Sequence, residues 1–173
     1  DLGTVAALPA NFNGSATAEG VVSGTSNPAA LVASALELGT ASTYAAAFEG
    51  VSGGAAKVYM PSAMCNAFGG QNTAYAVQNT GASSATVNVT YSNGATQSSA
   101  IAPGAKASFQ TCAATGMTQG FSGSAVLDAG AGSIVAIGKV SGLGLSTAFV
   151  GATAGAAKLA CPYVRWSVSQ YAS

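Results

Sequence analysis

The sequence contains no histidine and few charged residues: five Lys or Arg residues balance five Asp or Glu residues in a chain of 173. Without histidine, the chain lacks a common general base and the commonest metal ligand. The few carboxylates stand in no recognisable catalytic motif. We therefore expect no enzymatic activity, no cofactor and no metal site.

Clustered charge and long apolar runs are also missing. Nucleic-acid binding needs grouped Lys and Arg side chains, and a membrane-spanning helix needs about 18 or more consecutive apolar residues. The sequence has neither pattern, so we expect no nucleic-acid partner and no membrane span. The first residues lack the basic start and apolar stretch of a signal peptide, so a secreted chain would already have lost its signal.

Small and apolar residues are abundant instead. Hydrophobic residues make up 49% of the chain, there are 23 glycines, and the mean hydropathy is +0.41. This composition favours folding or association over a solvated, disordered state. A surface of low charge also lacks the repulsion that keeps copies of a protein apart. Composition therefore favours a structural protein whose partners are copies of itself.

Short alternating segments separated by turn residues predict β-strands. Residues 86–91 alternate between polar and apolar side chains, and the Asn93-Gly94 pair that follows indicates a tight turn. Further strands are expected at 73–79, 96–101, 106–110, 124–127, 133–140 and 145–150. Many short strands at this spacing predict an all-β, antiparallel β-sandwich.

Three blocks of sequence recur in the same order along the chain. Residues 12–16 match 121–125, residues 47–50 match 148–151, and residues 54–61 match 155–162. Repeats that cannot bury their own faces bury them against neighbours. We expect a partial repeat at 1–56, a complete sandwich unit at 57–157 and a terminal strand at 158–173, so that the chain begins and ends within a repeat. The repeat also favours a strand over a helix at 28–38.

Several short sequence segments of the central unit resemble those of a known type of module. Segments 58–65, 72–79, 87–91 and 101–109, with Phe-Ser-Gly-Ser-Ala at 121–125, resemble tandem, immunoglobulin-like β-sandwich repeats of secreted and cell-surface proteins of filamentous bacteria. The resemblance covers most of residues 57–164. It implies an immunoglobulin-like sandwich, an extracellular location and an architectural or adhesive role, and it supplies no active-site residues.

An extracellular location favours disulfide bonds among the three cysteines. Cys65 and Cys112 both lie in the central unit, in loops that flank expected strands, and we predict that they pair. Cys161 stands where Met60 stands in the other copy of the repeat, a position expected to face a core. A free, buried thiol that packs as a small hydrophobe is therefore expected for Cys161.

The terminal segment is the predicted means of assembly. We expect residues 158–173 to add as a strand to a neighbouring subunit, so that subunits join head to tail into an extracellular filament, pilus or sheath. Lys158 stands where Lys57 stands in the other copy, a position expected to carry a solvated charge. The residues expected to form the joining strand are Lys158, Leu159, Cys161, Tyr163, Val164, Trp166, Val168 and Tyr171.

The alternative function is a monomeric or tandem cell-surface module that is adhesive or binds carbohydrate. Its basis is the set of aromatic side chains, for which packing in cores and interfaces is the competing interpretation. Glycans are also candidate attachments, because Asn13 and Asn88 begin glycosylation sequons. Asn88 is expected to face away from Val87 and Val89 and is the more accessible of the two.

Overall fold

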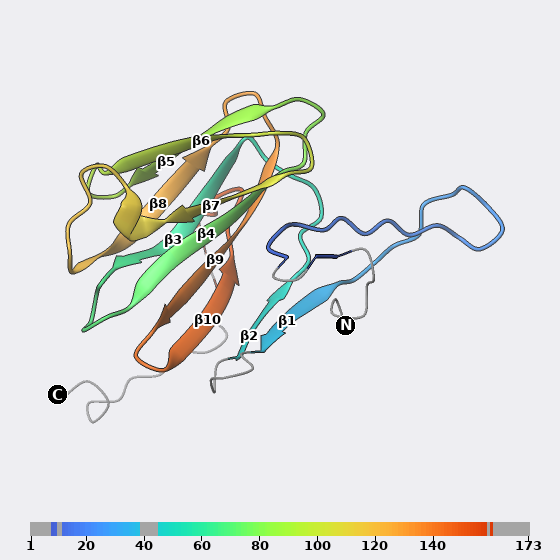
Figure 1. Ribbon diagram of the computed structural model, residues 1–173. Coiled ribbons are helices and arrows are strands. Elements are labelled where there is room, and N and C mark those ends of the chain that lie inside the picture. The colour runs from blue at the N-terminus through green and yellow to red at the C-terminus, as the bar shows by residue number, and fades with distance from the viewer. Residues whose placement is uncertain (1–7, 10–11, 39–44, 159, 161–173) are drawn as a thin grey trace.

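The computed structural model describes residues 8–9, 12–38, 45–158 and 160, and within these ranges the chain is all-β. Two four-stranded antiparallel sheets pack face to face (Figure 1). One sheet has the order β3-β8-β5-β6 and the other β10-β9-β4-β7. Their bounds are β3 Lys57–Cys65, β4 Asn72–Asn79, β5 Ala85–Tyr91, β6 Thr96–Ile101, β7 Lys106–Gln110, β8 Phe121–Asp128, β9 Ile134–Gly142 and β10 Leu145–Val150. The predicted antiparallel β-sandwich is therefore confirmed.

The alternation in the sequence explains how each strand meets the core. In β5, Val87 and Val89 are fully buried between the sheets, while Asn88 between them is exposed. The core also holds Tyr75 and Tyr91, whose rings stack with centroids 6.3 Å apart, and the ring of Phe121 packs edge-on against Tyr91. Large buried aromatic rings at the centre offset the small average size of the residues in this chain.

The strand order differs from that of an immunoglobulin domain. If β3 to β9 are lettered A to G, the sheets read A-F-C-D and E-B-G, with β10 added beside G. The B–E and C–F pairs are those of the immunoglobulin arrangement, in which A pairs with B and G pairs with F. Here the first, fourth and seventh strands (A, D and G) lie in the opposite sheet from their immunoglobulin counterparts. The immunoglobulin-like part of the fold prediction is therefore not confirmed.

A separate two-stranded ribbon precedes the sandwich. β1 (Ser34–Leu38) pairs antiparallel with β2 (Ala45–Glu49), and β2 lies next to β10 (Figure 1). Lys139 on β9 forms an ion pair with Glu37 on β1, and Ala46 is the buried residue of the ribbon. The strand expected within 28–38 is confirmed for its second half. Residues 12–16, which match the start of β8 in sequence, form no strand.

Asn79 is a buried polar residue that the sequence did not single out. At the end of β4, its Nδ2 donates to the carbonyl oxygens of Ser83 and Ile101, at 2.8 Å each, and its Oδ1 accepts from the Gly81 N–H at 2.9 Å. These bonds fix the β4–β5 connection against the end of β6.

We expect Asn79→Ala to lower the free energy of unfolding by roughly 2 kcal/mol, because it leaves buried backbone groups without partners. Urea denaturation measures the loss. Asn88→Ala is the matched control, since Asn88 is exposed and substitutions of that kind change stability by less than about 0.5 kcal/mol. Equal stability of the two variants would show that the Asn79 bonds contribute nothing net.

Candidate assembly surfaces

The predicted disulfide is present. The Cys65 and Cys112 sulfurs are 2.03 Å apart and the two Cα atoms 4.8 Å apart. The bond ties the end of β3 to a short 3₁₀ helix, η2 (Thr111–Ala113), which follows β7. Cys65 is completely buried, so the bond joins the edge of one sheet to the connection leaving the other. Cys161 lies outside the described residues.

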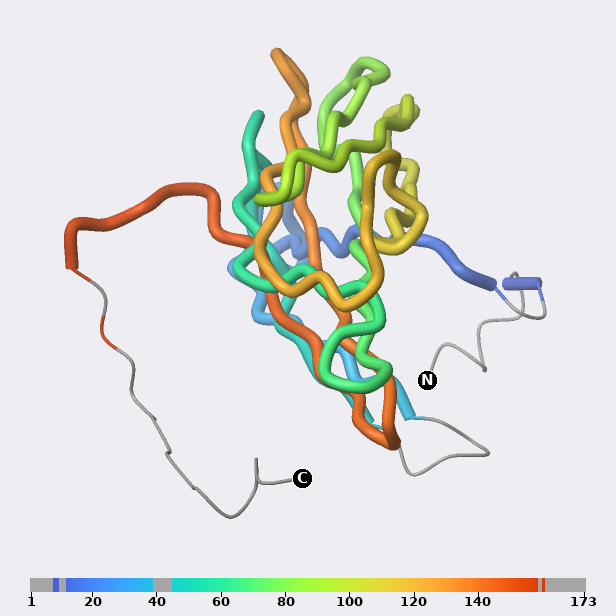
Figure 2. Tube along the Cα trace, turned by 90° about the vertical axis from the view of Figure 1, so that its left-hand side faces the viewer, coloured from blue at the N-terminus to red at the C-terminus, as the bar shows by residue number. Residues whose placement is uncertain are grey.

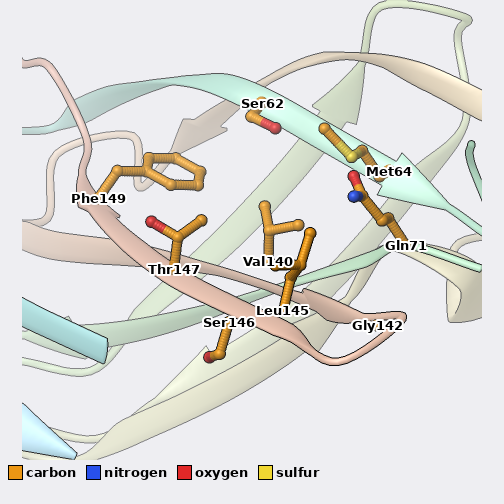
Figure 3. Close-up of a pocket in the computed structure, with 9 residues that line it drawn as sticks. All are labelled: Ser62, Met64, Gln71, Val140, Gly142, Leu145, Ser146, Thr147 and Phe149. Atoms are coloured by element: carbon orange, nitrogen blue, oxygen red, sulfur yellow. The ribbon is translucent and has the colours of Figure 1, made fainter. Parts of the chain in front are cut away.

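An open pocket of about 360 Å³ lies between the two sheets at one side of the sandwich. Its walls come from the two edge strands: Ser62 and Met64 on β3 face Leu145, Thr147 and Phe149 on β10 (Figure 3). The Ser62 hydroxyl is buried, and it has no hydrogen-bond partner among the residues that the structure describes. β3 and β10 thus leave a gap at this side near Ser62 and Met64.

The chain leaves the sandwich along this same side. After β10, Ala152 bridges to Tyr59 of β3, with N–O distances of 2.7 and 2.9 Å. Gly151 lies so close to β3 that an added Cβ would stand 2.3 Å from Val58 Cγ1. Residues 152–158 are then exposed and run away from the body, as the red segment in Figure 2 shows. The described part of the chain thus ends beyond the β3 side of the sandwich.

The N-terminal residues lie on the opposite side, beside β7. We call residues 12–33 the arm. Ser15 Oγ donates to the Gly104 carbonyl at 3.0 Å, and Lys106 Nζ at the start of β7 donates to Asn13 Oδ1. Because β7 and β10 are the two ends of one four-stranded sheet, the arm and the chain exit are on opposite edges of the sandwich (Figure 2).

The arm extends beyond the sandwich and exposes large apolar side chains (Figure 1). Val21 is 64% exposed, Leu31 55% and Val32 fully, and in the adjoining β1 every residue is exposed. Within the described ranges, residues 13–19 make no backbone–backbone hydrogen bond. The arm therefore offers both apolar side chains and unpaired main-chain groups to another chain.

One ion pair marks the alignment of β3 with β8. Lys57 Nζ lies 3.0 Å from Asp128 Oδ2, and the two residues are directly opposite in the register. Hydrogen bonds from the Gly130 N–H and from Lys57 lower the pKa of Asp128, and the bond to Asp128 raises the pKa of Lys57. Both side chains are nearly half exposed, so the pair contributes little to stability but marks the register.

The remaining predicted residues are distributed as follows. Of the expected joining strand, Lys158 is exposed, while Leu159, Cys161, Tyr163, Val164, Trp166, Val168 and Tyr171 lie outside the described residues. Both sequon asparagines are exposed, and Asn88 does face away from Val87 and Val89. Tyr75 and Tyr91 are buried in the core, so they are not available to a sugar-binding platform.

The two buried tyrosines make stability sensitive to alkaline pH. Burial raises the pKa of Tyr75 and of Tyr91, because the phenolate would lose its hydration in the core. Because the folded protein favours the neutral phenol, the raised pKa stabilises the fold at pH values below about 10, the ordinary pKa of tyrosine. This stabilisation is lost as the pH rises further.

With no histidine to titrate, we expect the urea midpoint to be constant from about pH 5 to 9 and to fall above about pH 10. Tyr91→Phe is expected to reduce the alkaline loss. Tyr59→Phe, at a side chain 44% exposed, is the matched control and is expected to leave the pH profile unchanged. An undiminished midpoint at pH 11 would contradict the argument.

Neither a metal site nor a membrane-crossing helix is found in the part of the chain that the structure describes. No three His, Cys, Asp or Glu side chains there are grouped so as to hold an ion, and no described helix is long and apolar enough to span a bilayer. The features that sequence reasoning missed are the protruding arm and the pocket between β3 and β10. Comparison with protein-family models, with curated proteins and with solved structures finds no match to this chain.

Proposed function

We propose that this protein is a structural subunit of an extracellular filament, pilus or sheath whose subunits join head to tail by β-strand complementation. The observation that carries the proposal is the placement of two exposed segments at opposite edges of one sandwich. The arm lies beside β7, and the chain exit lies beside β3. A contact between opposite sides of identical subunits is heterologous and need not close, so it generates a filament.

The ribbon and the arm supply a reason for association. β2 packs next to β10, whereas β1 remains an exposed edge strand, and exposed strand edges promote pairing with other chains. In β1, Leu36 is 66% and Leu38 65% exposed, and an edge of this kind is usually protected by charge or by a covering segment. Here a neighbouring subunit would provide that cover.

The edge pocket supports the same mechanism. Its apolar walls, Met64 and Phe149 among them, and its unpartnered Ser62 hydroxyl resemble a sheet edge prepared for an added segment. Main-chain hydrogen bonds along an added strand would give affinity, and its alternate side chains would give specificity. The low charge of the chain leaves little repulsion to oppose this packing.

Assembly of the purified chain tests the proposal. At micromolar concentration we expect polymers that sediment and that appear as long, thin fibres by negative-stain imaging. Their amount is expected to increase with protein concentration above a threshold. A single monomeric species up to about 100 µM, a concentration far above the Kd of an ordinary stable interface, would reject the filament and favour the cell-surface adhesive module instead.

A further inference from the structure

We infer that residues 158–166 of one subunit pair with residues 12–19 of the next in the register in which β3 pairs with β8, with Lys158 opposite Glu19. This inference rests on the proposed function and adds to it the identity of the two strands and their alignment. The occupant of the arm is thus the C-terminal segment of a second copy of this chain.

The template for the interface is the β3–β8 pair within one subunit. Lys57 lies opposite Asp128 at one end, Met60 lies opposite Ala125, and Cys65 lies opposite Phe121 at the other end, with an irregularity between Met60 and Ala63. An ion pair closes the first end of this ladder. The inward-facing residues of β3 are Val58, Met60, Ala63 and Cys65.

The two proposed strands carry the sequence features of this template. Residues 158–166 read Lys-Leu-Ala-Cys-Pro-Tyr-Val-Arg-Trp against Lys-Val-Tyr-Met-Pro-Ser-Ala-Met-Cys in β3. Residues 12–19 read Phe-Asn-Gly-Ser-Ala-Thr-Ala-Glu against Phe-Ser-Gly-Ser-Ala-Val-Leu-Asp in β8. Both copies therefore place a lysine on one strand and a carboxylate at the position that lies opposite.

Local geometry agrees with the sequence match. In β8 the Phe121 ring covers Gly123, where an added Cβ would stand 2.7 Å from the ring. In the arm the Phe12 ring covers Gly14, where an added Cβ would stand 2.2 Å from the ring. In both segments the ring of the phenylalanine thus covers the glycine two residues further on, although residues 12–20 form no strand in the single chain.

Placement in the fold favours pairing between subunits over pairing within one. Residues 13–17 are held near β7 by Lys106 and Gly104, whereas Lys158 follows the exit at the β3 edge. Glu19 and Lys158 are both exposed, and neither makes an ion pair with any residue that the structure describes. The register sets Lys158 opposite Glu19, Cys161 opposite Ala16 and Trp166 opposite Phe12.

Charge reversal tests the pairing and its intermolecular nature. We expect Lys158→Glu alone, and Glu19→Lys alone, to raise the threshold concentration for polymers about tenfold, since like charges would then face each other in an interface. The double variant is expected to assemble within about threefold of the natural chain. An equimolar mixture of the two single variants is also expected to assemble. In such a mixture the glutamate at position 158 of one variant can lie opposite the lysine at position 19 of the other.

Crosslinking tests the register independently. Ala16→Cys places a thiol opposite Cys161, at a spacing that a disulfide spans in an antiparallel pair. Under mild oxidation we expect a ladder of covalent oligomers on non-reducing gels. Thr17→Cys, whose side chain would point to the other face of the strand pair, is expected to give about tenfold less covalent oligomer.

The possible results separate this inference from the proposed function. If fibres form, but neither the double variant nor the mixture restores assembly and Ala16→Cys gives no covalent ladder, the proposed register is wrong. The proposed filament function is not affected by that result. Rescue by the double variant without rescue in the mixture would mean pairing within one chain and would overturn the inference. If the natural chain forms no polymer, the proposed function fails first. Unchanged thermal unfolding of all variants shows that the sandwich remains folded.

Discussion

Deletion of residues 158–173 abolishes polymer formation and leaves a folded, monomeric sandwich: this is the result we expect with the largest effect. The strands of the two sheets run from Lys57 to Val150, and the disulfide lies within them, so the shortened chain keeps its core. Only the segment proposed to bind the next subunit is lost. Sedimentation and negative-stain imaging measure the polymer, and urea denaturation measures the fold.

Two controls make the deletion decisive. A shortened chain mixed with an excess of natural chain is expected to terminate fibres, because it still presents an arm but no joining strand. The isolated peptide 158–173, added in excess, is expected to occupy the arms and slow growth. If the shortened chain forms the same fibres as the natural one, strand donation by this segment is wrong, whatever other contact builds the polymer.

Removal of the Cys65–Cys112 disulfide is expected to have the largest effect on stability. The bond closes a loop of sequence separation 47, for which loss of chain entropy in the unfolded state amounts to about 4 kcal/mol. It also holds the buried end of β3, whose other edge faces the open pocket. We expect Cys65→Ala with Cys112→Ser to lower the free energy of unfolding by about 3–4 kcal/mol, measured by urea denaturation.

Cys161→Ser is the matched control for this variant. It removes the third thiol, and because the shortened chain is expected to fold without its C-terminal segment, we expect monomer stability to be unchanged. In the Cys161→Ser variant, where Cys65 and Cys112 are the two remaining cysteines, a mass that is lower by two hydrogens than after reduction would establish the bond. Equal urea midpoints for the double variant and the natural chain would show that the bond does not stabilise the fold.

Local sequence predicted most of the strands. Residues 86–91 and 96–101 lie within or coincide with β5 and β6, because period-two alternation and an Asn-Gly turn act over a few residues. The strand expected at 124–127 is longer in the structure, since β8 begins at Phe121. The Ser and Gly residues before 124 have low strand propensity, and pairing with β3 extends the strand through them.

Asn79 shows what local patterns do not reveal. Its side chain is buried because Ser83 and Ile101 present carbonyl groups to it, and Ile101 is far along the chain. Period-two alternation places Asn79 on the same face as Tyr75 and Val77, whereas Asn88 lies on the opposite face from Val87 and Val89. Alternation gives no sign, however, that a polar side chain at this inward position has hydrogen-bond partners, because the Ser83 and Ile101 carbonyl groups are brought near only by the fold.

The sequence by itself determined the all-β class, the balance of few charges, most strand positions and the cysteines able to pair. These properties depend on composition or on residues near one another in the chain. Only the tertiary structure decided that β3 and β10 are edge strands flanking a pocket, that the arm lies beside β7, and that the strand order departs from the immunoglobulin arrangement. Which strands lie at the edges depends on pairing between strands far apart in the sequence, as in the pairing of β3 with β8. Local sequence does not reveal this, because period-two alternation is the same in an edge strand as in a central one.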